Sequence, residues 1–187
     1  MKKRTLANLV MVALIAAIGV GGIGLALGLR DRLPGDLGTA FSAPALEDAA
    51  LSLPKAAGQC TLSIRCDTVL ENTRSLADEK IPYVPADGVI LPPTTLDIAP
   101  GETAFTLLQR VCQAGQIPLE YSWTPVYDSY YVEGIAHLYE FDCGPESGWM
   151  YQVDGRCPNY GASAYKLTGG ETVCWRYTCT GLGTDIS

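Results

Sequence analysis

The sequence predicts an α+β domain: a mixed sheet of short strands, one main helix and disulfide staples. Six or seven segments alternate apolar and polar residues as half-buried strands do, and one segment after Pro100 has helical spacing instead. All seven cysteines lie between Cys60 and Cys179, a density typical of small exported domains. These three observations define the fold class.

The N-terminus carries an apolar segment of membrane-spanning length. Lys2, Lys3 and Arg4 precede 25 uncharged residues from Thr5 to Leu29. That length spans a bilayer, and the basic flank keeps the N-terminus in the cytosol and exports the rest. Residues 1–30 are therefore interpreted as a signal anchor or a signal peptide.

Two interpretations of that segment stay open. Its length favours an uncleaved anchor, which gives a single-pass cell-membrane protein with the C-terminal domain outside. Cleavage at the small residues 40–43 gives a secreted protein instead.

The rest of the chain divides into a linker, a domain and a tail. Residues 31–58 are rich in Pro, Gly and Ala without a sustained period, as in a flexible linker. Residues 59–181 form the expected domain and 182–187 a tail. From residue 31 onward, nine Lys and Arg face 20 Asp and Glu, a net charge of −11. This acidity argues against a nucleic-acid partner and leaves the N-terminal helix as the membrane attachment.

The first strand of the domain is predicted at Cys60–Cys66, where Cys60, Leu62, Ile64 and Cys66 share one face. A long irregular loop with one helical turn follows over 67–85. The turn 86–88 leads into a second strand at Val89–Leu91. Because Pro92 and Pro93 cannot donate ladder hydrogen bonds, this strand should lie at a sheet edge or end early.

The main helix begins after Pro100-Gly-Glu, with Thr103 as the expected cap. Four residues recur at helical spacing and should face the core: Phe105, Leu108, Val111 and Cys112. Gly115 ends the helix.

The second half of the domain holds the remaining strands, at 117–123, 130–135 and 137–141, followed by two aromatic strands. The alternation of Trp149 and Tyr151, and of Trp175 and Tyr177, predicts buried rings on paired strands. A helix crossing a mixed sheet after an opening hairpin is similar to the β-grasp layout, whose first and last strands lie side by side and parallel. We therefore expect a small β-grasp-like domain.

Residues 147–179 carry motifs that resemble a known family. They are a Ser-Gly-Trp-Met-Tyr strand, an Asp-Gly turn, Pro-Asn-Tyr-Gly, Tyr-x-Leu, Gly-Glu and Trp-x-Tyr. The pattern resembles the exported bacterial family called domain of unknown function 4430, which is similar to the C-terminal domain of transcobalamin and intrinsic factor. The resemblance covers about residues 59–180. It implies this fold and, as a ligand, a corrinoid (cobalamin-like) or another bulky molecule.

The sequence has no CxxC pair and a single histidine, which argues against a zinc site. The cysteines are therefore expected to form disulfides. Against the family pattern, Cys157 and Cys174 are the unusual ones, which pairs them. Cys66 and Cys179 are the second predicted pair, because both lie near the C-terminal ends of the first and last strands, which are expected to be neighbours. The third pair is Cys112 with Cys143, and the odd cysteine, Cys60, is left free or joins two chains.

No set of residues predicts catalysis, so the chain is expected to be neither an enzyme nor a cofactor carrier. His137 is the one imidazole, lies in a strand beside aromatic residues and has no nucleophile motif near it. The acids Glu133, Glu140, Asp142 and Glu146 gather near one loop. They could hold calcium or act as an acid/base pair, but without a calcium-loop pattern a solvated rim is favoured.

Aromatic residues in turns are the candidate binding site. Ten Tyr and three Trp against three Phe favour rings with a wet polar tip, which suits a ligand wall or an interface. The predicted contacts are Tyr127, Tyr130, Tyr131, Asn159 and Tyr160. In transcobalamin and intrinsic factor the related domain acts beside a helical partner, which this chain lacks, so the resemblance implies a helical partner protein. The sequence predicts a non-enzymatic, membrane-tethered binding module. The alternative is a structural or adhesive cell-surface domain that contacts proteins and has no small-molecule site.

Overall fold

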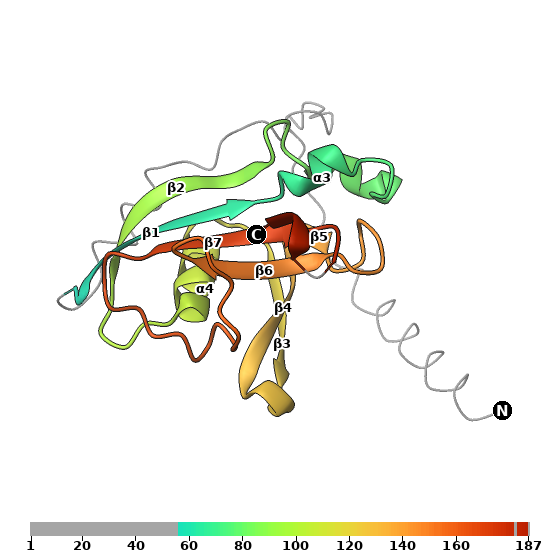
Figure 1. The fold of residues 1–187 in the computed structure, drawn as a ribbon. Coiled ribbons are helices and arrows are strands. Elements are labelled where there is room, and N and C mark those ends of the chain that lie inside the picture. The colour runs from blue at the N-terminus through green and yellow to red at the C-terminus, as the bar shows by residue number, and fades with distance from the viewer. Residues whose placement is uncertain (1–55, 182, 187) are drawn as a thin grey trace, which may run out of the picture. The chain divides into compact units, whose positions relative to one another are not determined.

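The computed structural model describes residues 56–181 and 183–186 (Figure 1). The predicted signal segment and most of the linker lie outside these residues. Within the described part, an α+β fold is present, and no helix there is long and apolar enough to cross a bilayer. Its main sheet has the strand order β2-β1-β7-β6, with bounds Val89–Ile98, Gly58–Arg65, Thr172–Thr178 and Gly148–Val153.

The first and last strands form the centre of this sheet. β1 and β7 run parallel, with Leu62 opposite Val173 and Ile64 opposite Trp175. This is the side-by-side parallel pairing that the sequence predicts. The buried face of β1 is also as predicted, because Cys60, Leu62 and Ile64 are at most 2% exposed.

Strand β2 lies at the sheet edge, as its two prolines require, but it does not end early. Leu62 pairs with Thr94 and Ile64 with Leu91, so Pro92 and Pro93 together oppose one residue of β1. This bulge absorbs the missing donors without ending the ladder. Of the two predicted alternatives, the edge position is therefore the one confirmed, and the strand runs on to Ile98.

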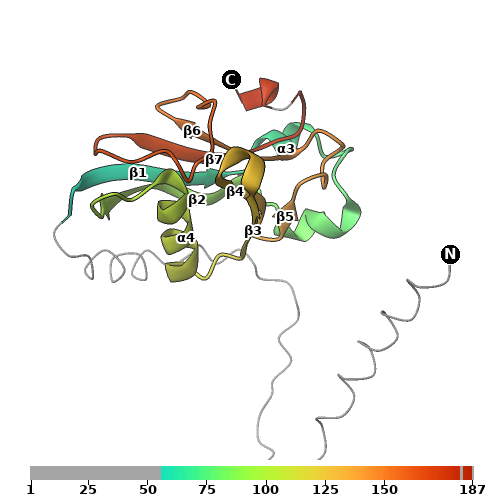
Figure 2. The same cartoon turned by 90° about the horizontal axis from the view of Figure 1, so that it is seen from below.

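Helix α4, Ala104–Ala114, packs on one face of the main sheet (Figure 2). A capping box fixes its start: the Thr106 amide donates to Thr103 Oγ1 at 3.1 Å, and the Thr103 amide donates to Thr106 Oγ1 at 2.8 Å. Gly115 caps the C-terminus as predicted. Phe105, Leu108, Val111 and Cys112 are all buried in the core.

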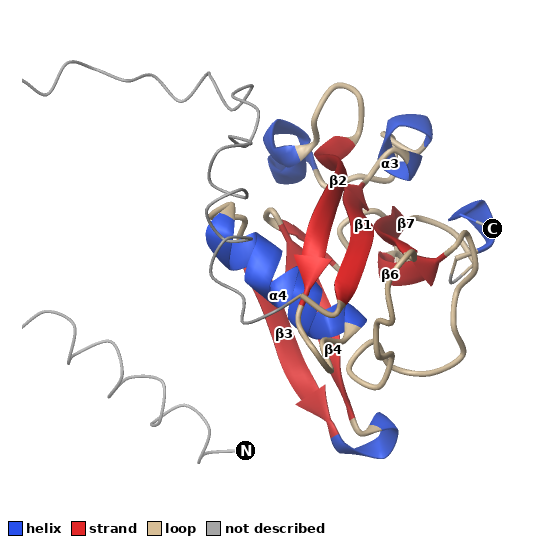
Figure 3. Ribbon diagram, turned by 90° about the vertical axis from the view of Figure 1, so that its left-hand side faces the viewer, coloured by secondary structure: helices blue, strands red, loops and turns tan. Residues whose placement is uncertain are grey.

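A second, three-stranded antiparallel sheet follows the helix, in the order β3-β4-β5. Its bounds are Leu119–Thr124, Ser129–Ile135 and Leu138–Tyr139. The β3–β4 hairpin projects away from the main sheet, with the 3₁₀ helix Pro125–Tyr127 at its tip (Figures 1 and 3). Asp128 closes the turn in the left-handed region, with φ of 46°.

Short helices occupy two segments that the sequence presents as irregular. The loop after β1 contains α3, Thr68–Glu71, and a 3₁₀ helix, Asp78–Tyr83. In the predicted tail, the 3₁₀ helix Thr184–Ile186 folds back on the sheet. Gln152 donates to the Ile186 carbonyl at 2.7 Å, and this contact explains why Ile186 is buried.

The four aromatic residues of β6 and β7 are buried, as predicted: Trp149, Tyr151, Trp175 and Tyr177. Buried polar tips need partners. The Trp149 indole donates to the Leu138 carbonyl at 2.8 Å, and the Tyr177 hydroxyl donates to the Tyr139 carbonyl at 2.6 Å. These bonds attach β5 to the main sheet.

The structure contains none of the three predicted disulfides, and all seven cysteines are free. Cys157 and Cys174 flank Gln152: Cys174 is its partner across the ladder, and Cys157 follows the tight turn that begins at Val153. Cys143 Sγ donates to the Asn72 carbonyl at 3.6 Å, and Cys179 Sγ donates to Thr68 Oγ1 at 3.7 Å, so neither is bonded to its predicted partner.

Candidate functional site

The β3–β4 hairpin presents three aromatic side chains on one face. Trp123 is paired with Tyr130 across the ladder, and Tyr121 is paired with Val132. Because side chains alternate along each strand, Tyr121, Trp123 and Tyr130 point to the same side. We call these three residues the aromatic face.

The rings of the aromatic face form one connected cluster with Tyr130 at its centre. Tyr130 contacts Tyr121 edge-on at a centroid distance of 5.2 Å and Trp123 at 5.1 Å. Beneath it, the ring of Phe105 stacks at 4.7 Å with an interplanar angle of 19°. Phe105 also meets Tyr121 edge-on at 5.0 Å. The buried ring thus anchors the exposed ones to helix α4.

The aromatic face combines exposure with fixed geometry. Tyr121, Trp123 and Tyr130 are 36%, 48% and 40% exposed. Gln109, on helix α4, donates to the Tyr121 hydroxyl at 2.7 Å. A flat ligand placed on these rings would meet a surface whose side chains are already ordered, so binding would cost little rotamer entropy.

The hairpin tip carries the most exposed large apolar residues among those described. Val126 is 86% and Tyr127 74% exposed. The predicted contact residue Tyr127 is therefore accessible, at the end of the hairpin and in the 3₁₀ helix rather than on a strand.

The predicted neighbours Tyr130 and Tyr131 point to opposite faces of the hairpin. The Tyr131 hydroxyl donates to Glu140 Oε2 at 2.6 Å. Burial and this acceptor raise the pKa of Tyr131 to about 12. On the same sheet the Tyr139 hydroxyl donates to Glu120, and chiefly this bond raises the pKa of Tyr139 to about 12. Strand alternation separates Tyr131 from the aromatic face.

The loop with Asn159 and Tyr160 continues to Ser163, which meets the start of β4 beside the hairpin tip. Both residues are exposed, and Tyr160 stacks on Tyr165 at 5.8 Å. The Tyr130 amide donates to Ser163 Oγ at 3.0 Å. The Phe105 amide donates to the Ala162 carbonyl at 3.2 Å. The structure thus joins the loop that carries Tyr160 to the elements that carry Tyr130 and Phe105.

Tyr121 and Trp123 are absent from the predicted site, although the sequence holds a signal for them. Two large aromatic residues two positions apart in a strand share one face. The strand is short and lies at the edge of a small sheet, where burial on that face is incomplete. Sequence reasoning selected residues in turns and passed over those in the adjoining strand.

His137 and the neighbouring acids are tied into structural contacts. The rings of His137 and Tyr83 lie 4.7 Å apart, and Lys80 donates to the His137 carbonyl at 3.0 Å. Lys80 also pairs with Asp142 at 3.1 Å. Glu146 accepts a bond from the Gly181 amide at 2.8 Å. In residues 56–181 and 183–186, no group of three or more His, Cys, Asp or Glu side chains could hold a metal ion.

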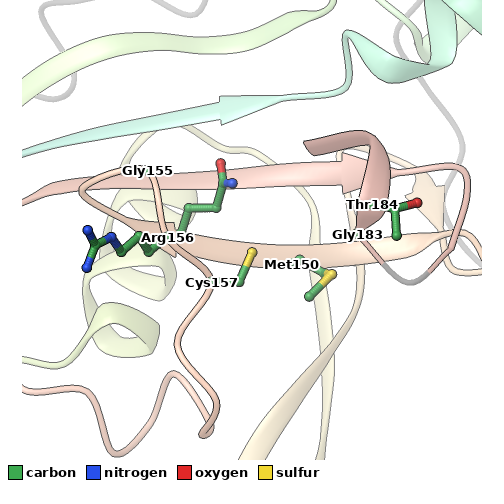
Figure 4. A pocket seen from close by; sticks show the side chains of 7 residues that line it. Met150, Gly155, Arg156, Cys157, Gly183 and Thr184 are labelled. Atoms are coloured by element: carbon green, nitrogen blue, oxygen red, sulfur yellow. The ribbon is translucent and has the colours of Figure 1, made fainter. Parts of the chain in front are cut away.

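A hollow lies on the outer side of β6, between the β6–β7 turn and the C-terminal 3₁₀ helix (Figure 4). Its volume is about 440 Å³. Met150, Gln152, Cys157 and Arg156 are among the residues that line it. Arg156 is its one charged lining residue, and no set of convergent polar groups defines a ligand there.

One known protein family matches part of this chain. The family described as domain of unknown function (DUF4430) matches residues 101–179. These residues are similar to that family. The match spans α4, the projecting hairpin and both aromatic strands, and it confirms the resemblance that the sequence motifs predict.

Two solved structures are similar to the chain. One is haptocorrin in complex with Cbi, with a TM-score of 0.46 and 14% identity over 65% of this chain and 25% of that one. The other, from Ruminococcus gnavus ATCC 29149, has a TM-score of 0.39 and 9% identity over 65% of this chain and 96% of that one. The chain therefore spans a quarter of the haptocorrin chain. No curated protein matches it.

Proposed function

We propose that this chain is a non-enzymatic, exported binding module that holds a flat, bulky ligand on the aromatic face of the β3–β4 hairpin. The observation that carries the proposal is the cluster of three exposed rings centred on Tyr130 and backed by the buried ring of Phe105. Exposed aromatic rings in contact with one another are a surface on which planar ligands stack.

The position of this surface supports the proposal. The hairpin extends beyond the main sheet (Figure 3), and its three rings are 36–48% exposed, so a ligand can reach them. The loop with Tyr160 adjoins the same hairpin through Ser163 and Tyr130. A ligand larger than one ring system would meet both elements, and this supports a bulky ligand rather than a small one.

A corrinoid is the first ligand class to test. The resemblance to the transcobalamin-type domain suggests it, and a corrin is a flat macrocycle with bulky substituents. We further propose that the N-terminal segment tethers the module to the cell membrane with the domain outside. Tight binding would then need a helical partner protein that covers the other side of the ligand.

The test is a calorimetric titration of the detergent-solubilised full chain with cobalamin and related corrinoids. We expect micromolar binding, a free energy of about −8 kcal/mol. Trp123→Ala and Tyr130→Ala should each weaken it at least tenfold, because each removes a central contact. No heat with any corrinoid, in the presence or absence of candidate helical partners, would reject this ligand class.

Matched controls lie on the opposite side of the same hairpin. Ser122→Ala and Tyr131→Phe change exposed groups on β3 and β4 that point away from the aromatic face. Both should bind as the parent does. Equal losses in Tyr130→Ala and Tyr131→Phe would show that the binding surface is not the aromatic face.

The hairpin tip supports the second candidate, an adhesive domain that contacts another protein. Val126 and Tyr127 expose more of their surface than any residue of the aromatic face. Exposed apolar residues at a protruding tip are typical of a protein contact. If Val126→Asp abolishes cell-surface adhesion while corrinoids give no heat, the adhesive function replaces the ligand-binding one.

A further inference from the structure

We propose that Cys143 and Cys179 form a disulfide that ties the loop after β5 to the end of β7. This pair differs from the pairs that the sequence favours, since those join Cys179 to Cys66 and Cys143 to Cys112. The inference is independent of any ligand. It rests on where the fold places the two thiols.

The sulfurs of Cys143 and Cys179 both contact helix α3 or its C-cap residue. Cys143 Sγ donates to the Asn72 carbonyl at 3.6 Å, and Cys179 Sγ donates to Thr68 Oγ1 at 3.7 Å. Asn72 and Thr68 are one helical turn apart, and Asn72 Nδ2 donates to the Thr68 carbonyl at 2.9 Å. The two thiols are close enough for each to shift the pKa of the other.

Tyr177 holds both backbones in place. Its hydroxyl is hydrogen-bonded to Ser147 Oγ at 2.9 Å, and Ser147 Oγ accepts a bond from the Cys143 amide at 3.0 Å. Its carbonyl accepts a bond from Thr68 Oγ1 at 2.6 Å. Cys179 lies two residues further along the chain, where its amide donates to Asp185 at 2.8 Å. The approach of the thiols is therefore fixed by buried contacts on both sides.

The other cysteines have different surroundings. Cys60 faces the carboxylates of Glu171 and Glu102, and Cys66 faces those of Asp67 and Asp87. Cys112 lies inside α4, where burial raises the pKa of its thiol to about 12. Cys157 and Cys174 are kept on either side of Gln152 by the register. Cys143 and Cys179, which both contact α3 and its C-cap, are the pair in the described part of the chain whose thiols shift each other's pKa.

The reaction needs a two-electron oxidant, and a small-molecule disulfide such as oxidised glutathione supplies it. One cysteine thiolate attacks that disulfide and expels one thiol, which leaves a mixed disulfide. The second thiolate attacks the mixed disulfide, forms the Cys143–Cys179 bond and expels the other thiol. Two protons leave the protein and two electrons reduce the oxidant.

The burial of both cysteines determines the stage of folding at which this thiol–disulfide exchange takes place. Cys143 is 1% and Cys179 6% exposed, and burial raises the pKa of both thiols. Thiolates are scarce in the folded, reduced domain at neutral pH, and a bulky oxidant has no access to them. The bond therefore forms as the chain folds in an oxidising compartment, before the corner closes.

The test uses the detergent-solubilised full chain, refolded with oxidised and reduced glutathione and then blocked with N-ethylmaleimide. Cleavage after Lys, Arg and Glu places each of the seven cysteines on its own peptide. We expect the peptides 141–146 and 177–187 to be recovered as one disulfide-linked species. Recovery of both peptides in alkylated form, or linked to other peptides, overturns the proposal.

Thermal unfolding gives a second measurement. Cys143→Ser, Cys179→Ser and the double variant should all unfold roughly 10 °C below the oxidised parent, because each removes the same bond. Reducing the parent should lower its midpoint to the same value. Cys157→Ser, at an exposed site, is the control and should unfold as the parent does. A double variant whose unfolding midpoint lies clearly below that of both single variants would contradict a shared bond.

Discussion

The ring of Tyr130 lies flat on the ring of Phe105, with centroids 4.7 Å apart and planes inclined by 19°. One residue is 40% exposed on a projecting hairpin, and the other is 2% exposed on the core face of helix α4. This single contact connects the hydrophobic core to the candidate binding surface. Changes in the core under Tyr130 should therefore affect ligand binding.

Phe105→Leu tests that connection. The variant keeps an apolar side chain in the core but removes the stacking partner of Tyr130. We expect a loss of about 1–2 kcal/mol in unfolding free energy. We also expect several-fold weaker ligand binding by calorimetry. Val111→Ala is the matched control, because it removes core volume from the same helix and leaves every ring of the cluster in place. It should reduce stability and leave the binding constant unchanged.

The ion pair between Glu102 and Arg110 provides a second prediction. Arg110 Nε donates to Glu102 Oε1 at 2.9 Å, and the Glu102 side chain is only 6% exposed. Glu102→Leu should cost about 3 kcal/mol in urea unfolding, because it leaves a guanidinium without its partner. The double variant with Arg110→Met should recover most of the loss. If the two single losses simply add, the pair is not coupled.

Asp67 should make stability depend on pH. Burial opposes ionisation of this carboxyl, but hydrogen bonds from Arg176 and Arg65 outweigh it and hold its pKa below the usual 3.8. The unfolded chain therefore takes up the proton first as the pH falls. The stabilisation is present above the unfolded pKa and is lost as the pH falls through the folded one.

Asp67→Asn checks that dependence. At neutral pH the variant should be about 2 kcal/mol less stable, because the charge-assisted bonds to two arginines are lost. Between roughly pH 5 and pH 2 the difference from the parent should shrink toward zero. Urea unfolding at several pH values measures it. A difference that stays constant over this range would show that Asp67 does not act through its charge.

Gly134 is expected to tolerate no side chain. A Cβ at this position would lie 2.5 Å from Cδ1 of Tyr139, whose ring packs across the strand. Gly134→Ala should therefore cost about 1–3 kcal/mol in unfolding free energy. The control is Gly148→Ala, where the nearest atom to a Cβ is 3.7 Å away. Equal stability of the two variants would mean that the Tyr139 ring moves aside without cost.

Local pattern was enough to predict much of the fold. The period of two in 60–66 and 149–153 and the helical spacing from Phe105 to Cys112 identified the buried faces, because burial follows the geometry of a single element. The likeness to the β-grasp layout, rather than local periodicity, predicted the parallel pairing of β1 and β7. Local patterns also identified turns that expose Tyr127 and Tyr160.

What depends on contacts between distant segments was decided by the tertiary structure alone. Strand register placed Tyr130 on one face of the hairpin and Tyr131 on the other, and joined Tyr121 and Trp123 to the first. Packing placed the thiols of Cys143 and Cys179 against α3 and its C-cap, a proximity that no local pattern contains. A sequence specifies the buried face of each element through periodicity. Which elements meet, and therefore which rings and thiols touch, follows from the packing of the whole chain.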